Sequence, residues 1–381
     1  MGVRNMNCLV KVVRATIISM LHLQIELFMG DANTSCADQE RRALVNMKNA
    51  FADDYGRLTS WGSSPNCCQW SGVLCNPQTG HVEMLDLSDQ QQGQQPLRGE
   101  ISPSLTDLQH LIYLNLSYND FNGSEIPKFL GSLIKLTYLD LGYSGFGGKI
   151  PTEFGKLSNL RVLKLSFNGL IGGIPVHLAN LSSLQDLRLD GNHLVGSIPS
   201  QLANLSSLQS LQIGFNDGLK VDDKSLVGIE WLSNLRSLTS LDLSAISNLN
   251  YSNNLLPIIG KLPSLRELWL TNCSLTNFNI VSTLSSQLNF SASLVTLNLG
   301  YNKLTSSFFP WLFNLSSNLA NLYLYNNQLD GPIPDDFGKY MNSLVRLDLY
   351  GNNLNGTISE VHIGNLTKLQ LLDLSDNLLS L

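Results

Sequence analysis

The chain has 381 residues, and only 14% of them are charged, with a formal net charge of −6 at pH 7. This balance gives no strong case for a nucleic-acid partner, because such partners favour a strongly basic surface. The length could hold two or three ordinary domains. No stretch reaches about 18 uninterrupted apolar residues, so the sequence predicts no membrane span.

The N-terminus predicts a signal peptide over residues 1–30. The basic residues Arg4, Lys11 and Arg14 precede an apolar stretch over 15–30, which is the order found in secretory signals. Polar side chains interrupt this stretch, so a buried or disordered extension stays open as the alternative. A signal peptide would assign the chain to the secretory pathway.

Residues 36–80 predict an N-terminal cap that contains one helix. Asp38 is expected as the N-cap residue, because its side-chain oxygen can accept from a free backbone N–H. Leu44, Met47 and Phe51 follow at helical spacing and would share one face. The first coil of a repeat array has no upstream neighbour, so its apolar end needs such a cover.

Cysteines gather in this predicted cap, at Cys36, Cys67, Cys68 and Cys75. A metal site is one interpretation, but two adjacent cysteines suit tetrahedral zinc poorly. Two disulfides in an oxidising compartment are the favoured interpretation. Cys273 occupies a repeat position that suits a small buried residue, so we expect it to be structural and unpaired.

Residues 81–381 contain about twelve copies of the pattern Leu-x-x-Leu-x-Leu-x-x-Asn, spaced 24 to 30 residues apart. A period of this length marks a leucine-rich-repeat solenoid. We therefore predict an α/β repeat fold, a right-handed solenoid in which Leu-x-Leu forms one strand of a concave parallel β-sheet. The units begin at Val82, Leu111, Leu136, Leu160, Leu184, Leu208, Leu238, Leu265, Leu294, Leu319, Leu344 and Leu369.

The ninth position of each unit is usually asparagine, whose amide can satisfy backbone groups where the chain turns away from the strand. These asparagines are Asn119, Asn168, Asn192, Asn216, Asn302, Asn327, Asn352 and Asn377. Ser144, Ile246 and Cys273 depart from the pattern. The spacing is also irregular over 217–294, where we expect distorted coils.

Eleven Asn-x-Ser/Thr sequons support the same secretory compartment. The sites expected to carry glycans are Asn122, Asn180, Asn204, Asn250, Asn289, Asn314, Asn355 and Asn365. Asn180, Asn204 and Asn365 recur at one phase of the repeat, after the convex segment, so their glycans would lie off the concave side. Asn115 lies within a predicted concave strand, and its glycosylation is doubtful.

The cap and the repeats resemble the plant extracellular leucine-rich-repeat receptor-like proteins. The cap carries LTSW and CCQWSGVLC, and a Gly-x-Ile-Pro step recurs, ending at Pro127, Pro151, Pro175, Pro199 and Pro334. TGHVEMLDLS after Cys75 further resembles the defence receptors of plant immunity, of the Eix and Cf types.

This resemblance implies disulfides Cys36–Cys67 and Cys68–Cys75, and a position on the extracellular side of the plasma membrane. It also implies recognition of a microbial or peptide ligand, with a co-receptor kinase as signalling partner. Family receptors continue into more repeats, a C-terminal cap and a membrane span. The chain is therefore expected to be a truncated product or a fragment whose last coil exposes leucines to water.

Side chains that flank the inward leucines are the candidate ligand contacts. They are Tyr113, Tyr138, Tyr143, Phe167, Arg188, Trp269, Tyr323, Tyr325, Arg346 and Tyr350. Exposed aromatic and arginine side chains dominate many interfaces, because they bury much area at a small entropic cost. Aromatics at the eighth position, such as Tyr143 and Phe167, could instead stack on one another along the sheet edge, and both interpretations stay open.

The predicted groove is acidic. Asp140, Asp186, Asp190, Asp242, Glu267, Asp348, Asp373 and Asp376 outnumber Lys164, Arg188 and Arg346. This charge disfavours a polyanion and suits a neutral or basic protein or peptide. The alternative is that these acids only aid solubility.

No catalytic constellation is evident, since the six histidines are scattered and the glycine-rich steps follow the repeat. We predict no enzyme, no cofactor and no metal. The leading hypothesis is the ligand-recognition module of a plant defence receptor. The alternatives are a soluble inhibitor resembling polygalacturonase-inhibiting proteins, and a non-functional truncated receptor.

Overall fold

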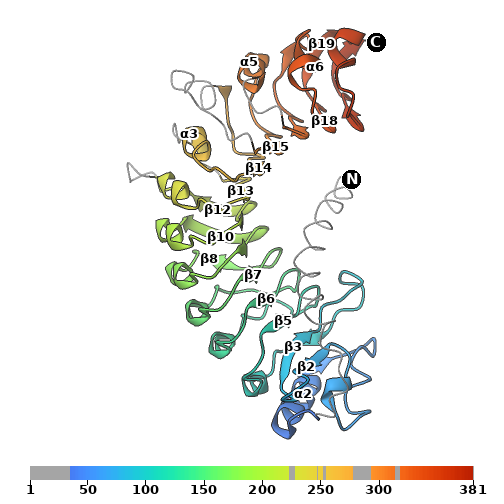
Figure 1. The fold of residues 1–381 in the computed structure, drawn as a ribbon, viewed down its shortest axis with the longest axis vertical. Helices are drawn as coiled ribbons and strands as arrows, with labels where there is room; N and C mark the ends of the chain where they lie inside the picture. Colours follow the sequence, from blue (N-terminus) through green and yellow to red (C-terminus); the bar gives the residue numbers. More distant parts are fainter. Residues whose placement is uncertain are drawn as a thin grey trace.

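The computed structural model describes residues 35–222, 228–246, 248–251, 255–277, 293–313 and 318–380. These residues form stacked coils that follow an arc from α2 (Asp38–Ala50) at one end to β19 (Asn353–Thr357) at the other (Figure 1). The strands of one long sheet run along one side of the arc, and short helices run along the other. The predicted leucine-rich-repeat solenoid with a stapled cap is confirmed.

The long sheet has 13 strands among the described residues, and they pair in chain order. All pairs are parallel except β2 with β3, which are antiparallel. The strands are β2 (Val73–Cys75), β3 (Val82–Asp86), β5 (Tyr113–Asn115), β6 (Tyr138–Asp140), β7 (Val162–Lys164), β9 (Asp186–Arg188), β11 (Ser210–Gln212), β13 (Ser240–Asp242), β14 (Glu267–Trp269), β15 (Thr296–Asn298), β16 (Asn321–Tyr323), β18 (Arg346–Asp348) and β20 (Leu371–Asp373).

Each coil places equivalent residues in register with the next, so that Leu114, Leu139 and Leu163 are direct neighbours. Successive side chains of a strand point to opposite faces. The central leucine of each strand therefore points into the solenoid, and its two flanking residues point to the concave side. The leucines at the first, fourth and sixth positions of the coils from 111 to 349 form one continuous buried core.

Four Ile-Pro steps start 3-10 helices on the convex side, those from η3 (Lys128–Ser132) to η6 (Ser200–Asn204). The isoleucine is buried, as at Ile150 and Ile174, and the following proline caps a 3-10 helix with φ near −65°. Proline suits this place because its ring fixes φ at that value. The helices are η2 (Pro103–Asp107), η3 (Lys128–Ser132), η4 (Thr152–Lys156), η5 (Val176–Asn180), η6 (Ser200–Asn204), η7 (Glu230–Asn234), η8 (Leu249–Tyr251), η9 (Ser306–Phe308), α3 (Leu255–Ile259), α5 (Phe309–Phe313), α6 (Phe337–Tyr340) and α7 (Glu360–Ile363).

Shorter sheets connect the coils between the concave sheet and the convex helices. One contains β8 (Ile171–Gly172), β10 (Asn192–Ser197) and β12 (Asn216–Lys220), and the other contains β17 (Asp330–Gly331), β19 and β21 (Leu378–Ser380). β1 (Phe51–Ala52) of the cap pairs antiparallel with β4 (Arg98–Gly99) of the first coil. These pairings join several of the coils to their neighbours at a second place.

The ninth-position asparagines form a hydrogen-bonded ladder through the interior. The Nδ2 of Asn192 donates to the carbonyl of Leu189 in its own coil at 3.0 Å and to that of Leu165 in the preceding coil at 2.9 Å. Its Oδ1 accepts from the backbone N–H of Leu170 at 3.1 Å. The predicted role of these asparagines is confirmed.

The departures from asparagine keep part of this ladder. The Ser144 hydroxyl donates to the carbonyls of Leu116 and Gly142 at 2.8 and 3.0 Å. Cys273 is a free, buried thiol with its sulfur 3.4 Å from the carbonyl oxygen of Leu243, and burial raises the pKa of this thiol to about 12. Cys273 is therefore structural and unpaired, as predicted.

The irregular spacing over 217–294 leaves the concave sheet intact in the described residues. β11, β13, β14 and β15 keep their register without a shift. The described part of this segment contains the α-helix α3, where the preceding coils have a 3-10 helix. Much of the remaining segment lies outside the described residues. The last coil exposes Leu371, Leu372 and Leu378, at 44, 39 and 71%, as expected.

The cap begins with α2, whose N-cap residue is Ala37 and not Asp38, so that prediction was wrong. Asp38 is the first residue of the helix and lies 3.6 Å from Arg41 as an exposed ion pair. Its carboxylate still lies beside the positive end of the helix dipole, which is a favourable place for an acid. Leu44 and Met47 are buried, as predicted, and Phe51 follows the helix into the core.

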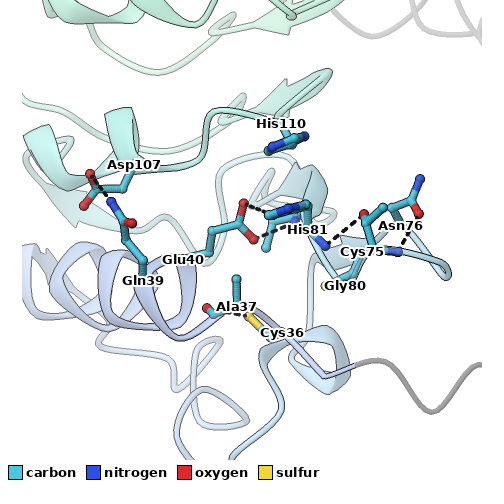
Figure 2. A network of polar contacts seen from close by, with 12 residues as sticks. Cys36, Ala37, Gln39, Glu40, Cys75, Asn76, Gly80, His81, Asp107 and His110 are labelled. Carbon is cyan, nitrogen blue, oxygen red and sulfur yellow. Dashed lines mark hydrogen bonds and ion pairs between the residues drawn. The ribbon is translucent and has the colours of Figure 1, made fainter.

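Glu40 attaches α2 to the first coil (Figure 2). Its buried carboxylate accepts from the backbone N–H of Val82 at 2.9 Å and lies 3.1 Å from Nδ1 of His81. His81 stacks on His110 of the next coil, with ring centroids 3.9 Å apart. Burial first, and then repulsion from His81 and Lys135, lowers the pKa of His110.

Disulfides join Cys36 to Cys67 and Cys68 to Cys75, with Cα atoms 5.4 Å apart in both pairs. This is the pairing that the sequence resemblance implies. The three cysteine sulfurs that come closest together, those of Cys36, Cys67 and Cys68, therefore belong to disulfides. They are not free to act as metal ligands.

Candidate ligand-binding face

The concave face consists of the third and fifth residues of each coil, which flank the buried central leucine. In the N-terminal half these residues run from Met84 and Asp86 to Ser210 and Gln212, and in the C-terminal half they run from Ser240 and Asp242 to Leu371 and Asp373. The strand register places the residues of each position in one row across the sheet. The two halves differ in how many of these side chains are buried or paired within the protein.

Tyr113 and Tyr138 are only 9 and 6% exposed, which corrects the expectation that they stand free for contact. Adjacent strands of a sheet are about 4.8 Å apart, so equivalent rings on neighbouring coils can stack. The centroids of these two rings are 4.3 Å apart, and Met84 and Val162 pack against the pair. Burial raises the pKa of both phenols well above its usual range.

Cations in the N-terminal half are already paired with carboxylates. Nζ of Lys164 lies 3.9 Å from Asp140 and 3.3 Å from the hydroxyl of Tyr138, which donates to Asp140. Nε of Arg188 lies 3.0 Å from Asp186. Burial opposes the charge of Arg188, but the charge and hydrogen bond of Asp186, together with the charges of Asp190 and Asp140, outweigh it, so the pKa of the guanidinium is raised. Arg188 is therefore occupied within its own strand.

Two further acids of the repeats, Asp190 and Asp242, are held by hydrogen bonds from nearby groups. The hydroxyl of Ser166 donates to Asp190 at 2.6 Å, and burial raises the pKa of that carboxyl. Asp242 accepts from the backbone N–H of Ser244 at 2.8 Å, and burial raises its pKa to about 6. These two carboxyls carry less negative charge at mildly acidic pH than the sequence count implies.

The eighth position has positive φ in all eleven coils from residue 111 onward, including the aromatic residues Tyr118, Tyr143 and Phe167. Their rings stack in series, with centroid distances of 4.6 Å for both neighbouring pairs. The next coil has Gly191, where a Cβ atom would lie 2.7 Å from the ring of Phe167. The stacking interpretation is thus correct for these rings, although Tyr143 and Phe167 remain 43 and 38% exposed.

The C-terminal half carries the more open aromatic group. Trp269 in β14 and Tyr323 in β16 occupy the fifth positions of their coils. Their ring centroids are 6.0 Å apart, with an interplanar angle of 24°. Both side chains are partly exposed. The ring of Tyr325 lies against Gly300, where a Cβ atom would collide with it, and contacts Tyr301 edge-on at 5.4 Å.

Charged residues lie beside this aromatic group. Asp348 and Asp373 are in register on β18 and β20, next to Tyr323 on β16. Burial first, and then the neighbouring charge of Asp373, raises the pKa of Asp348. Tyr350 is 37% exposed, and its hydroxyl donates to Asp376, which raises the pKa of the phenol. Arg346 lies on the same face, two residues before Asp348.

The sequons divide by exposure. Among the described candidates, Asn250 is half-buried and the others are exposed, at Asn122, Asn180, Asn204, Asn355 and Asn365. Asn180 and Asn204 are the last residues of η5 and η6, on the convex side. Asn115 is 8% exposed in β5, which agrees with its doubtful glycosylation. Asn289 and Asn314 lie outside the described residues.

Two features were not identified from the sequence. His81 and His110 each come directly before the first position of their coils, so the repeat phase alone would have predicted that they lie side by side.

A hollow of about 400 Å³ lies on the convex side, lined by Pro310, Phe313, Pro334, Asp335, Asp336 and Tyr340. Sequence phase alone did not indicate it, because α5 and α6 replace the usual 3-10 helices there.

Three families match the sequence. Residues 96–332 match the family described as "Leucine-rich repeat region", residues 37–76 match "Leucine rich repeat N-terminal domain", and residues 317–379 match "Leucine rich repeat". In the described part of the chain, no helix has both the length and the apolar character needed to cross a membrane.

Curated relatives and solved structures also point to leucine-rich-repeat receptors. The chain is similar to Receptor-like protein EIX1 of Solanum lycopersicum, at 36% identity over 84% of the chain and 27% of the relative. It is 40% identical to Receptor-like protein EIX2 of the same plant, over 90% of the chain and 29% of the relative. The chain thus spans a little more than a quarter of the length of these relatives. The ectodomain of the Arabidopsis receptor kinase HAESA, solved in complex with an N-terminal extended IDA peptide hormone ligand, aligns with a TM-score of 0.59 at 26% identity, over 90% of this chain and 66% of that one.

Proposed function

Because the chain belongs to the leucine-rich-repeat family, in its branch of plant receptor-like proteins, we propose that it is the extracellular ligand-recognition module of a defence receptor. The observation that supports this proposal best is the partly exposed aromatic group around Trp269 and Tyr323 on an open sheet face. Open aromatic surfaces of this kind suit macromolecular contact rather than the enclosure of a small substrate.

The proposed ligand is a protein or an extended peptide. Twelve steps of about 4.8 Å between 13 strands give a face roughly 58 Å long. An extended peptide of about 17 residues would span that length. The candidate contacts are the partly exposed residues Trp269, Tyr323, Tyr325, Arg346 and Tyr350, with Tyr143 and Phe167 at the sheet edge. No role in direct contact is proposed for the buried Tyr113 and Tyr138, or for the paired Arg188.

The organisation proposed for the chain is a signal peptide over 1–30, a cap over 36–80 and about twelve repeats over 81–381. The receptor-like relatives and the two disulfides assign it to the secretory pathway or the extracellular space. We extend this to the outer side of the plasma membrane. The module is proposed to be non-catalytic and to signal through a partner kinase that binds alongside it.

Binding to an immobilised chain tests this proposal. The chain would be expressed with its disulfides and exposed to purified fungal xylanase, because the Eix-type defence receptors that the sequence resembles include receptors for fungal xylanase. The concave variant is Trp269→Ala with Tyr323→Ala, and the matched convex variant is Tyr340→Ala. We expect the wild type and Tyr340→Ala to retain xylanase, and the concave variant to weaken binding at least tenfold, since truncated hot-spot aromatics lose about 2 kcal/mol or more each.

Two outcomes would contradict the proposal. One is equal retention of xylanase by all three proteins, which would move binding off the concave face. The other is no retention of xylanase, or of any fungal culture protein or peptide fraction, at concentrations up to about 10 μM, well above specific affinities. Xylanase activity is measured in parallel, because retention with loss of activity would identify an inhibitor instead of a recognition module.

A further inference from the structure

One row of the concave sheet combines aromatic rings with carboxylates. The fifth residues of consecutive strands are Trp269, Asn298, Tyr323, Asp348 and Asp373, and each is in register with the next. In this row Tyr323 directly precedes the two acids, and Trp269 lies two strands before Tyr323, with the centroids of the two rings 6.0 Å apart. Neighbouring residues in such a row are about 4.8 Å apart along the sheet, so a single long side chain can contact an aromatic ring and an acid together.

The carboxylates of this row lack the protein cations that neutralise the equivalent row in the N-terminal half. There, Asp140 lies 3.9 Å from Lys164, and Asp186 lies 3.0 Å from Arg188. Among the residues that the structure describes, no cation lies within 4 Å of Asp348 or Asp373. Arg346 lies on the same face, two residues before Asp348, and is not within 4 Å of either carboxylate, so no ion pair among the described residues neutralises these two acids.

The two acids also act on each other. They face one another across β18 and β20, and the negative charge of Asp373 disfavours ionisation of Asp348. A cation from outside would relieve this repulsion. The ring faces of tryptophan and tyrosine attract cations through their quadrupoles, and carboxylates form charge-assisted hydrogen bonds with guanidinium groups. The same chemistry repels anions.

We propose that Trp269, Tyr323, Asp348 and Asp373 form a subsite for a cationic side chain, so that the ligand of this face presents an arginine or lysine where it crosses β14 to β20. This inference rests on the proposed function and adds the chemical class of the ligand. The aromatic pair receives the apolar stem and one face of the cation, and the carboxylates receive its hydrogen-bond donors. Arginine fits the row better than lysine, because a planar guanidinium can stack and form paired hydrogen bonds at once.

Two fluorescent peptides test the subsite, acetyl-(Gly-Arg)3-amide and the same sequence with citrulline in place of arginine. Citrulline keeps the shape of arginine and removes its charge. We expect the arginine peptide to bind at least fivefold more tightly to the wild-type chain at low salt, which is the size of a contact of about 1 kcal/mol. Asp348→Asn is expected to remove most of this preference, and Asp348→Glu to restore part of it.

The matched control is Glu100→Gln. Glu100 is an exposed carboxylate near the cap, so this variant has the same net charge as Asp348→Asn and differs only in where the charge is lost. It should change the arginine preference by less than about 1.5-fold, because exposed charges farther apart than about 10 Å are largely screened. An equal effect of the two variants would refute the subsite, since binding would then follow net charge alone.

The results also separate this inference from the proposed function. If arginine and citrulline peptides bind equally while Trp269→Ala with Tyr323→Ala still abolishes xylanase retention, the cationic subsite is wrong and recognition by the concave face stands. If the arginine preference is found but xylanase retention is unchanged by the concave variant, the subsite stands and the recognition proposal is wrong.

Discussion

Replacing Asn192 with alanine should destabilise the middle of the solenoid. Asn192 is 2% exposed, and its amide makes hydrogen bonds with Leu165, Leu170 and Leu189. Each hydrogen bond contributes about 1 kcal/mol net, and a buried partner left unsatisfied costs about 1–3 kcal/mol. The carbonyls of Leu165 and Leu189 also accept from Asn168 and Asn216, so only the N–H of Leu170 is left without a partner. The loss of three bonds should lower the stability of these coils by about 3 kcal/mol.

The effect should be local, because each coil of a solenoid contacts only its neighbours. Hydrogen exchange measured by mass spectrometry is therefore the suitable assay. The backbone N–H of Leu170, which donates to Asn192, should exchange at least a hundredfold faster, since each 1.4 kcal/mol corresponds to a factor of ten. Protection of the cap helix α2 should stay unchanged.

Asn159→Ala is the matched control, because the exposed Asn159 makes one hydrogen bond, to the carbonyl of Ile134 at 3.0 Å. Surface changes of this kind alter stability by about 0.5 kcal/mol or less. The reasoning would be refuted if Asn192→Ala behaved like this control. Exchange at Leu170 would then be unaltered, and the ladder would be an accompaniment of the fold rather than a support for it.

Three other predictions follow from the structure. Asp242→Asn should stabilise the chain at pH 7, by at most about 3 kcal/mol, because burial holds the pKa of this carboxyl near 6 in the folded state and its ionisation there opposes folding. Replacing Cys36 and Cys67 with serine should lower stability by about 3 kcal/mol, since the disulfide closes a loop with a sequence separation of 31. Glycopeptide mass spectrometry should find Asn204 glycosylated and Asn115 unmodified, because the side chain of Asn204 is exposed and that of Asn115 is buried.

Each of these has its own contradicting result. The unfolded Asp242 carboxyl ionises near 3.8 and the folded one near 6, so wild-type stability should fall as pH rises through this window. Thermal unfolding of Asp242→Asn at pH 3 should therefore match the wild type, and a gain that persists there would contradict the cause. A cysteine double variant that unfolds at the wild-type temperature would contradict the loop argument. A glycan found on Asn115 would contradict the third prediction, because it would mean that Asn115 is modified before β5 forms and buries it.

The repeat phase allowed most of the fold to be predicted from the sequence. The leucine spacing located every strand of the concave sheet except β2, which lies in the cap outside the repeats. The ninth-position asparagines form the backbone hydrogen bonds that their positions predict. The cap motifs and the Ile-Pro steps carried the resemblance to plant receptor-like proteins, which is confirmed. Such patterns can be recognised in a sequence because every coil buries equivalent residues in the same way.

The surface of the groove was harder to predict, because it depends on pairs of coils. Tyr113 and Tyr138 each occupy an outward position, and only their register one coil apart makes them bury each other. The pairing of Arg188 with Asp186 is an i, i+2 contact on one face of a strand, which a count of charges does not capture. The N-cap at Ala37 differs by one residue from the expected position, because the helix begins at Asp38 itself and the residue before it is the cap.

The layout of each coil also separates two kinds of mutational change. Residues that hold the coils together lie inside, at the leucine and asparagine positions, whereas the partly exposed residues of the third and fifth positions face the concave side. A substitution at Asn321 or Arg346, which are both partly exposed, would alter the chemistry of the face without opening the core. Because such surface changes have small effects on stability, the array can acquire new specificities one residue at a time while its backbone stays the same.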